Sequence, residues 1–399
     1  MPACTGLSLG PGVAPVNALQ QVQIPRGELV EAYEFNVPLN VVALRGSVPA
    51  QWLEEYKDVI TKFGGMTVHQ RGQLEDIYRE LSSSDKKGKT TRTADAVTLG
   101  DAYLEPAIRA GLLQPIQDAE HYRWWDALFP RWRQLVKRNA AGQLDRHGAV
   151  WGAPYRWGCT LVAYNNDKLV KWGGVPITDW SDLLQPRLKG KIAFMDSPRE
   201  FVGVALKTLG LPFNARARDL AAHGLTVEDV RRRIEQLREQ VRLFSNQEHT
   251  RAVTAGDAWA VVGWSGDLIP LASRSTAVHL VAPQSGTSLW ADLWVVPKGA
   301  CGGSAGQGPS PTLPLWLEFG LQPMRALSTR GLDRGTSPLL LPGGPTVVDG
   351  AKQGRPQADV NITVAPGVLP DAAILEGSEF LLPLDDETKQ MYNDLLRDM

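Results

Sequence analysis

The stretch of residues 149–210 constrains the fold more than any other part of the chain, because strand and helix signals alternate along it. Residues 152–164 mix small, aromatic and β-branched side chains, a pattern typical of a pair of strands, and turn-forming Asn and Asp residues follow. Asp179 can accept the first free amide protons of a helix, since its carboxylate stands just before that helix. Residues 191–195 predict a short apolar strand, and Pro198 stands in the first turn of the next helix, where no hydrogen bond is lost.

Several short motifs follow one another within this stretch. They are Pro-Tyr-Arg-Trp-Gly at 154–158, Tyr-Asn at 164–165, Trp-Ser-Asp-Leu at 180–183, Lys-Gly-Lys-Ile at 189–192 and Asp-Ser-Pro-Arg-Glu at 196–200. In this order they resemble the extracellular solute-binding proteins of ABC importers, specifically the spermidine/putrescine-binding branch. The resemblance implies a two-lobed α/β fold of the periplasmic-binding-protein type, class II. Each lobe would be a doubly wound, mostly parallel sheet flanked by helices, and crossover strands would form the hinge.

The length and the order of elements both predict two lobes. A chain of 399 residues exceeds the usual size of one hydrophobic core. Strands expected at 39–44, 66–70 and 94–99 alternate with helices, and this order predicts a doubly wound first lobe. The expected crossovers between the lobes are 155–160 and 284–292. We expect a flexible N-terminal tail at 1–37, lobe 1 at 38–154 plus 285–335, lobe 2 at 155–284 plus 336–399, and a Gly/Ser/Pro-rich insertion at 299–311.

Charge and composition narrow the range of partners. The chain has 42 basic and 43 acidic residues and a net charge of -1, so we expect no nucleic-acid partner and no overall attraction to anionic membranes. Tryptophan is unusually frequent, since 13 Trp exceed 9 Phe and 8 Tyr. We expect most of these rings to pack in the core and a minority to lie near a cleft, where they can stack on a ligand.

The cysteines and the first residues bear on the compartment. Cys4, Cys159 and Cys301 are too few and too scattered for a disulfide framework or a zinc site. No apolar run approaches the roughly 20 residues that span a bilayer. Residues 1–37 lack a basic start and a continuous apolar segment, which predicts no secretory signal peptide. The resemblance implies a periplasmic or extracytoplasmic protein, so we expect either a start further upstream or a copy that works elsewhere, for example in a plastid.

A polyamine site needs carboxylates at fixed separations and ring faces for the methylene and ammonium groups between them. The resemblance places Glu200 and Asp292 at carboxylates that bind amines, and Trp264 and Trp290 at stacking aromatic positions. Each carboxylate has a second interpretation. Asp292 can be a hydrogen-bond partner within the hinge, and Glu200 can be a carboxylate that interacts with the dipole of its helix.

In the first lobe, the expected ligand-binding residues depart from the family pattern. Where the first strand of the family ends in an aromatic-rich turn, this chain has Arg45. The family has a pair of tyrosines after the third strand. This chain has only one of them, Tyr103, which the resemblance places at the second position of the pair. A further acidic family position falls on Ser197. Tyr155, at the start of the first crossover, completes the candidate ligand-binding residues.

The basic residues leave the charge of the ligand open. If Arg45 points into the cleft, it would repel a polycation and favour a solute that carries a carboxylate or a phosphate. Arg156 in the cleft would act in the same direction. Alternatively, Arg45 can pair with Asp101. Glu200 and Asp292, in contrast, favour an amine.

The leading hypothesis is a monomeric two-lobed receptor that closes on a polyamine-like cation of the spermidine/putrescine class by hinge motion and delivers it to an ABC permease. The alternative is a receptor-derived binding protein for another small solute, such as an organic anion, or a component of an organelle assembly. We expect no enzyme and no cofactor, because the six histidines show no metal-ligand spacing and no nucleophile–base pair can be inferred. We also expect no metal site, because the iron-binding relatives use adjacent tyrosines, which this chain lacks.

Overall fold

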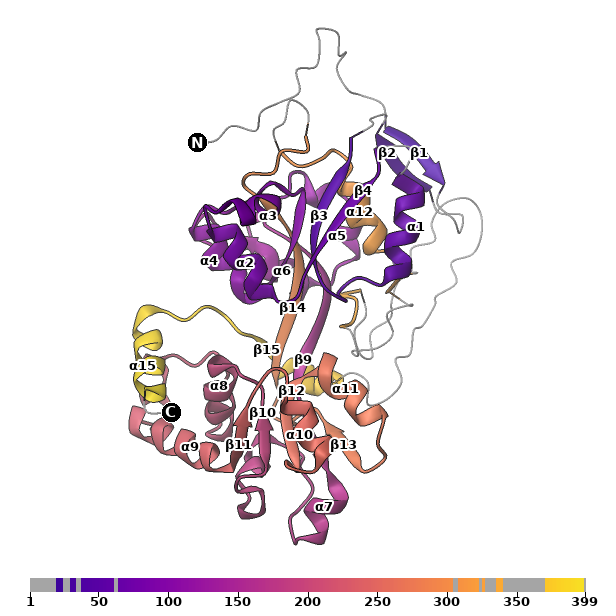
Figure 1. Cartoon of the computed structure of the whole chain (residues 1–399). Helices are drawn as coiled ribbons and strands as arrows, with labels where there is room; N and C mark the ends of the chain where they lie inside the picture. Colours follow the sequence, from indigo (N-terminus) through magenta and orange to yellow (C-terminus); the bar gives the residue numbers. More distant parts are fainter. Residues whose placement is uncertain are drawn as a thin grey trace.

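The computed structural model describes residues 19–23, 29–33, 37–60, 64–303, 308–322, 325–326, 335–339 and 370–397. The chain forms two α/β lobes, which lie one above the other in Figure 1. Two long strands, β9 (Ala153–Asn165) and β14 (Ser288–Pro297), run between them. The last helix, α15 (Asp386–Leu396), lies beside the lower lobe.

The upper lobe is organised around β3 (Leu39–Leu44). This strand pairs in parallel with β4 (Met66–Arg71) on one side and with β5 (Ala96–Gly100) on the other. Two helices, α1 (Ala50–Ile60) and α2 (Leu74–Ser82), connect these strands. Every residue of β5 is buried, as is usual for a parallel strand covered on both faces. The order of strands and helices expected for this lobe is therefore confirmed.

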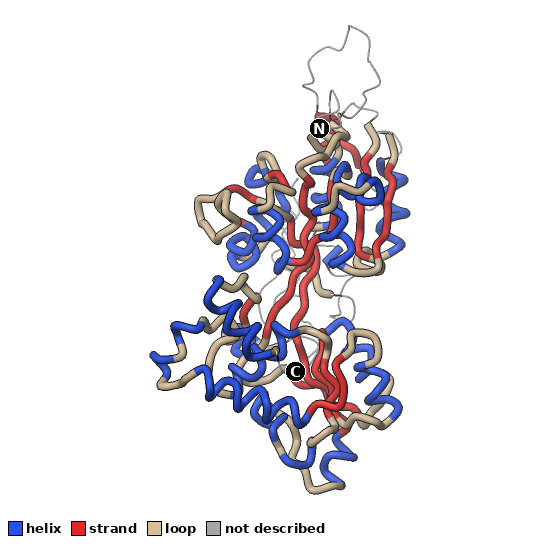
Figure 2. The backbone as a smooth tube through the Cα atoms, turned by 60° about the vertical axis from the view of Figure 1, so that its left-hand side comes forward, coloured by secondary structure: helices blue, strands red, loops and turns tan. Residues whose placement is uncertain are grey.

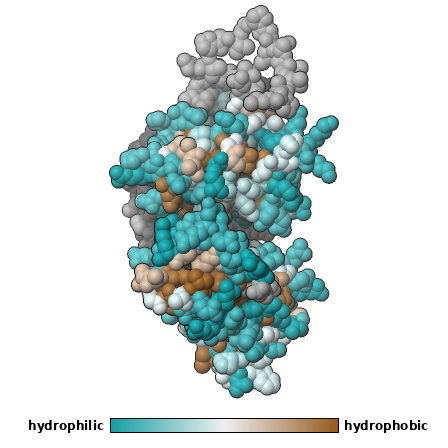
Figure 3. Space-filling model, turned by 90° about the vertical axis from the view of Figure 1, so that its left-hand side faces the viewer, coloured by the Kyte–Doolittle hydropathy of each residue, from teal (hydrophilic) through white to brown (hydrophobic). Residues whose placement is uncertain are grey.

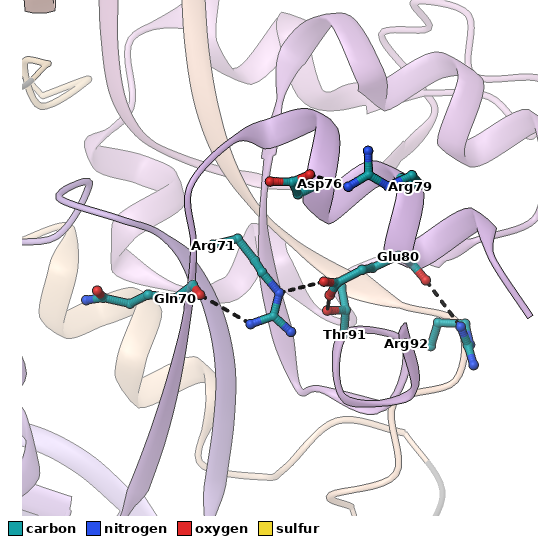
Figure 4. A network of polar contacts seen from close by, with 7 residues as sticks. All are labelled: Gln70, Arg71, Asp76, Arg79, Glu80, Thr91 and Arg92. Carbon is teal, nitrogen blue, oxygen red and sulfur yellow. Dashed lines mark hydrogen bonds and ion pairs between the residues drawn. The ribbon is translucent and has the colours of Figure 1, made fainter. Parts of the chain in front are cut away.

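A polar network centred on Glu80 joins α2 to its neighbours (Figure 4). Arg71 Nε, at the end of β4, donates to Glu80 Oε1 at 2.7 Å, and the hydroxyl of Thr91 in α3 (Lys89–Thr93) donates to the other carboxylate oxygen. Arg92 Nη1 donates to the Glu80 carbonyl oxygen at 3.2 Å. Burial alone would raise the pKa of Glu80, but the Arg71 and Thr91 donors together lower it. The carboxylate thus stays charged and holds the helix on the sheet.

The lower lobe repeats the plan with β10 (Ile192–Phe194) at its centre. That strand pairs in parallel with β11 (Val241–Phe244) and with β12 (Ala260–Trp264). Helices lie on both sides of these strands in Figure 1. They are α8 (Pro198–Thr208) and α9 (Val227–Gln240) on one side, and α10 (His249–Ala255) and α11 (Ser265–Ser273) on the other.

The crossover strands fuse the two sheets into one. β9 runs antiparallel to β12 in the lower lobe and to β14 between the lobes, and β14 in turn runs antiparallel to β5 in the upper lobe. Figure 2 shows these strands passing side by side from lobe to lobe. The expected pair of strands at 152–164 is wrong, because a single strand of 13 residues covers this stretch. No turn interrupts it, since its two ends pair in different lobes.

Shorter elements complete the fold, and the two crossover strands also take up short partners. Both β13 (Val278–Val281) and β15 (Glu379–Phe380) lie against them, on β9 and β14 respectively. Within the described ranges, the remaining α-helices and strands are α4 (Leu104–Arg109), α5 (Arg123–Ala127), α6 (Pro130–Val136), α7 (Asn166–Lys171), α12 (Leu313–Gly320), α14 (Ala372–Glu376), β6 (Leu113–Gln114), β7 (Lys137–Arg138) and β8 (Ala149–Val150).

Parts of the N-terminal segment, of the insertion and of the region after residue 339 lie outside the described residues. Within the expected tail, β1 (Leu19–Gln23) pairs antiparallel with β2 (Leu29–Tyr33), and the rest of 1–36 lies outside the described residues. In the Gly/Ser/Pro-rich insertion, the Ser310 amide donates to Asp95 Oδ1 at 2.7 Å, which ties that end to the upper lobe. Residues 340–369 also lie outside the described part.

The face shown in Figure 3 is mostly hydrophilic, with scattered apolar residues on the upper lobe and a denser apolar group on the lower one. Of the helices in the described ranges, none has the length and apolar character needed to cross a bilayer.

Candidate ligand-binding site

The register of β9 and β14 brings two predicted site residues together between the lobes. Trp290 lies opposite Gly158, and Asp292 lies opposite Arg156. Because alternate side chains of a strand point to the same face, these four residues share one face of the two-stranded crossover. The sequence motif Trp-Ala-Asp thus places a ring and a carboxylate side by side at the junction of the lobes.

A buried ion pair occupies the centre of this face. Arg156 Nε donates to Asp292 Oδ2 at 2.5 Å, and the guanidinium carbon lies 5.4 Å from the centre of the Trp290 ring. Burial acts to lower the pKa of Arg156, but the Asp292 carboxylate outweighs it and the pKa is raised. The contact agrees with the second interpretation of Asp292, a hydrogen-bond partner within the hinge strands.

Two glycines allow the Trp290 ring to lie flat against the backbone. A Cβ atom on Gly158 would come within 2.2 Å of Trp290 Cζ2. Gly335, with a φ of +86°, approaches from the other direction, where a Cβ atom would lie 3.2 Å from Trp290 Cη2 and 3.0 Å from Arg156 Cδ. The indole Nε1 is buried and has no hydrogen-bond partner among the described residues. The ring is therefore sandwiched between β9 and the segment 335–339.

Glu200 connects α8 to both crossover strands. Its carboxylate accepts hydrogen bonds from Thr160 Oγ1 of β9 at 3.1 Å and from Ser288 Oγ of β14 at 2.7 Å. Only 4% of Glu200 is exposed, and burial raises its pKa, an effect that the two hydroxyl donors partly offset. The side chain therefore holds together the lower-lobe ends of the hinge strands. Ser197, another predicted site residue, caps α8. Its Oγ accepts a hydrogen bond from the Glu200 backbone amide at 3.4 Å.

Trp264 stands at the end of β12, directly opposite Thr160. It is half-buried against the core of the lower lobe. The next residue, Ser265, accepts the Cys159 amide with its hydroxyl at 3.3 Å and faces the Trp290 ring across Gly158. The structure therefore gathers Trp264, Glu200 and Trp290 around the same short section of β9.

Tyr155 belongs to the upper-lobe side of this region. Its hydroxyl lies 2.8 Å from Ser47 Oγ and 3.0 Å from Thr98 Oγ1, and its ring stacks on Trp294 at 4.7 Å. Burial raises the pKa of Tyr155, and the nearby Asp292 charge adds to the effect. The phenol therefore links β9 to β5 and to the turn after β3.

Two of the predicted site residues, Tyr103 and Arg45, lie in the upper lobe. The Tyr103 hydroxyl donates to Glu75 Oε1 at 2.9 Å, and its ring stacks on Tyr78 at 4.9 Å, so both of its functional groups are used within the upper lobe. Arg45 is exposed in the turn after β3, and within the described ranges it makes no contact with Asp101. The suggested pairing of Arg45 with Asp101 is therefore wrong.

Asp101 was missed as a site residue, although it lies beside Asp292. Its Oδ1 accepts the backbone amide of Ala291 at 2.9 Å, and the side chain is buried. Burial, with a further contribution from the Asp292 charge, raises the pKa of Asp101 to about 7, against a lowering effect of Arg138. Its place in the sequence could have pointed to it, because Asp101 follows directly after β5 and ligands of α/β sheets bind at the carboxyl ends of strands.

In the part of the chain that is described, no group of three or more His, Cys, Asp or Glu residues is placed to hold a metal ion. Cys159 is a buried free thiol.

A protein-family model described as a bacterial extracellular solute-binding protein matches residues 54–303 of the chain. The putrescine-binding periplasmic protein PotF of Escherichia coli is 26% identical over 220 residues, or 52% of this chain and 56% of that protein. A putrescine/cadaverine-binding protein of Pseudomonas aeruginosa is 30% identical over 187 residues, or 41% of this chain and 48% of the relative. The matched part thus spans about half the length of these curated relatives.

Solved structures show the same fold over nearly the whole chain. The spermidine/putrescine transporter substrate-binding protein PotD of Streptococcus pneumoniae superposes with a TM-score of 0.67 at 18% identity, covering 91% of this chain and 98% of that one. A spermidine/putrescine transporter protein described as putative, from Listeria monocytogenes, gives 0.63 at 19% identity, covering 90% and 98%. The expected two-lobed α/β fold class is confirmed.

Proposed function

The chain belongs to the family of bacterial extracellular solute-binding proteins, and from this premise we propose that it is a receptor for a polyamine-like linear amine. In this proposal the protein is a monomer that works outside the cytoplasm. It captures the amine between its lobes and delivers it to an ABC importer. The relatives named for putrescine support the choice of an amine. The observation that carries the proposal is the placement of Trp290 and Asp292 side by side on β14, with Glu200 and Trp264 next to them.

The charges of this region favour a cation. Three buried carboxylates, those of Asp101, Glu200 and Asp292, lie in this region, whereas its cations are two, the largely buried Arg156 beside Asp292 and the buried Arg138 near Asp101. Buried carboxylates are stable when they are paired, so a region with more carboxylates than cations is stabilised by an ammonium group. The faces of the Trp264 and Trp290 rings suit the methylene and ammonium groups of such a ligand.

We propose that β9 and β14 act as the hinge between the lobes. In this proposal lobe 1 is 38–154 plus 285–335 and lobe 2 is 155–284 plus 336–399. The lower lobe supplies Trp264 and Glu200, the upper lobe supplies Asp101, and Tyr155 lies at the upper-lobe end of the crossover strand β9. Closure of the lobes around the amine would remove its ammonium groups from water. The carboxylates that pair with these groups would compensate for the lost hydration.

The test is calorimetric titration of the whole purified chain with putrescine, cadaverine, spermidine and spermine, and with the singly charged amines of the same lengths. We expect micromolar or tighter binding of at least one linear amine. The binding should be lost in Asp292→Ala and retained in Asp257→Ala, which removes an exposed carboxylate at the other end of β12. The absence of binding by every linear amine would refute the proposed receptor.

A further inference from the structure

Three large apolar side chains are exposed within six consecutive residues of the lower lobe. Val170, Trp172 and Val175 are 48%, 58% and 59% exposed, and they are three of the five exposed large apolar residues in the described part of the chain. The segment that carries them, 170–175, forms the end of α7 and the turn after it, at the end of the lower lobe that is farthest from the upper lobe (Figure 1). Single exposed apolar residues are ordinary, but a group that includes an indole marks an interaction surface.

The fold holds this segment in an ordered turn. The Gly174 amide donates to the Leu169 carbonyl oxygen at 2.9 Å, and Gly173 has a φ of +74°, which favours glycine. The side chain of Gln185 accepts the Val175 amide at 2.9 Å and donates to the Val175 carbonyl oxygen at 3.1 Å. Because these hydrogen bonds fix the backbone, the outward position of the apolar side chains is built into the turn.

Basic side chains lie close to these apolar residues. The Trp172 ring stacks on the half-buried Trp259 ring at a centroid distance of 6.3 Å, and Lys191 Nζ lies 5.5 Å from the centre of the Trp259 ring. Arg187 reaches the turn itself, since its Nε would lie 4.0 Å from a Cβ atom on Gly173. The tip surface, as we call it here, consists of Val170, Trp172 and Val175 with the four basic residues Lys168, Lys171, Arg187 and Lys191.

The charge of the tip surface is positive. Within the described ranges, none of its four basic side chains forms an ion pair. Two exposed carboxylates adjoin it, Asp167 at the start of α7 and Asp257 shortly before Trp259, so four cations face two anions. Lys189 adds no net charge, because it pairs with Glu239 at 2.8 Å. A partner of this surface therefore has to combine an apolar layer with negative charge.

A second copy of the chain does not meet this requirement. A symmetric dimer through the tip surface would bring its basic residues against those of the partner, and like charges oppose such a contact. The three apolar side chains expose on the order of 300 Å², well below the roughly 800 Å² that each partner buries in a stable protein–protein interface. A membrane needs less area, because single indole rings concentrate at the level of the lipid headgroups and basic residues are attracted to anionic lipids.

We propose that the tip surface docks the lower lobe on a bilayer that carries anionic lipids. Trp172 and the two valines enter the headgroup region, and the four basic side chains contact the negatively charged lipid groups. The tip surface is separate from the candidate ligand-binding site, so this proposal goes beyond the amine receptor and does not depend on it.

Cosedimentation of the whole purified chain with lipid vesicles tests the proposal. One set is phosphatidylcholine, and the other contains about 30 mol% phosphatidylglycerol. We expect binding to the anionic vesicles with a constant on the order of 10⁴ M⁻¹, the strength of one acyl anchor. Binding should be about fivefold weaker or less on phosphatidylcholine, and it should weaken as salt is added.

Two variants remove the two contributions separately. Trp172→Ala should weaken binding to both kinds of vesicle about tenfold, because it removes the indole that enters the headgroup region. Lys171→Gln should weaken binding to the anionic vesicles alone, about fivefold. The matched controls, Leu144→Ala and Lys86→Gln, change exposed residues outside the tip surface and should bind as the wild type does. Trp172→Phe keeps a ring, so it should still bind while quenching of tryptophan fluorescence by brominated lipid decreases.

Three results would overturn the proposal. The first is the absence of wild-type binding to anionic vesicles at millimolar lipid. The second is binding that neither Trp172→Ala nor Lys171→Gln weakens, since the contact would then lie elsewhere on the molecule. The third is a dimer in analytical ultracentrifugation that Trp172→Ala dissociates, which would assign the surface to a second copy. Calorimetric titration of Trp172→Ala with linear amines should match the wild type, so the failure of either proposal leaves the other testable.

Discussion

The carboxylate of Glu200 accepts the hydroxyl of Ser288 at 2.7 and 2.9 Å, although 88 residues separate them in the sequence. This contact fastens the first turn of α8 to the first residue of β14. The lower-lobe end of the crossover is therefore rigidly attached to its lobe. In the proposed hinge, bending would fall to the part of β14 beyond it, where the pairing with β9 shifts register between Asp292 and Leu293.

Replacing Glu200 by Ala should lower the free energy of unfolding by about 2 kcal/mol, because it leaves the buried hydroxyls of Thr160 and Ser288 without their acceptor. Glu200→Gln should cost less, since its amide oxygen can still accept one hydroxyl. Urea unfolding of the three proteins measures this, with the exposed Glu239→Ala as the control. Unchanged stability with impaired amine binding would instead assign Glu200 to the ligand alone.

Asp101 should make the protein less stable as the pH rises. Its pKa is about 7 in the folded chain and near the usual 3.8 when unfolded, so between these values the folded state holds a proton that the unfolded state has lost. Stability should therefore fall as the pH rises from 4 to 7, by up to about 4 kcal/mol. Glu200, whose pKa is also raised, contributes in the same direction.

Asp101→Asn should flatten this dependence, because the amide has no proton to lose and its oxygen can still accept the Ala291 amide. Urea unfolding at pH 5 and pH 8 provides the measurement. An equal loss of stability between these pH values in the wild type and in Asp101→Asn would show that Asp101 does not cause it.

Gly158→Ala should destabilise the protein by about 1–3 kcal/mol, since the added methyl group would overlap the Trp290 ring. Removing the ring should relieve the larger part of the overlap, so Gly158→Ala should cost less in a Trp290→Ala background, where only the Ser265 hydroxyl still lies too close to the added methyl group. A double-mutant cycle in urea measures this coupling. Gly72→Ala, at a position with open space around the new atom, should change little in either background. Additive effects at 158 and 290 would contradict the packing of the ring on β9.

The Arg156–Asp292 pair should be costly to break from one side only. Arg156→Met should lower the free energy of unfolding by about 3–5 kcal/mol, because it leaves a buried, unpaired carboxylate. In the double variant Arg156→Met, Asp292→Leu most of this loss should be recovered, since no buried charge remains. Thermal or urea unfolding distinguishes the cases. A double variant as unstable as the single one would show that packing, and not charge, explains the effect.

Several features follow from the sequence because their causes are local. Thr226 caps α9 by accepting the amide of Asp229, and Asp385 caps α15 by accepting that of Thr388, so each cap involves residues only three positions apart. The prediction that Asp179 caps the helical element after it is also confirmed, and this element is a five-residue 3-10 helix. The ordered motifs of the 149–210 stretch likewise identify the two-lobed fold, since each marks the end of one strand or the start of one helix.

The candidate site was only partly predictable. The motifs placed Trp290 and Asp292 correctly on one strand, and the structure brings Glu200 and Trp264 close to them. The role of Tyr103 in ligand binding stays a prediction, and its contacts with Glu75 and Tyr78, which lie on a helix elsewhere in the sequence, could not be read from the motifs.

What the sequence determined by itself is the succession of strands, helices and caps, because each depends on residues that are close along the chain. The tertiary structure alone decided which charges meet. Arg156 pairs with Asp292 across 136 positions, and Asp101 accepts the Ala291 amide across 190. Both contacts depend on the register of β14 against β9 and β5, and a shift of one residue would turn these side chains to the opposite face.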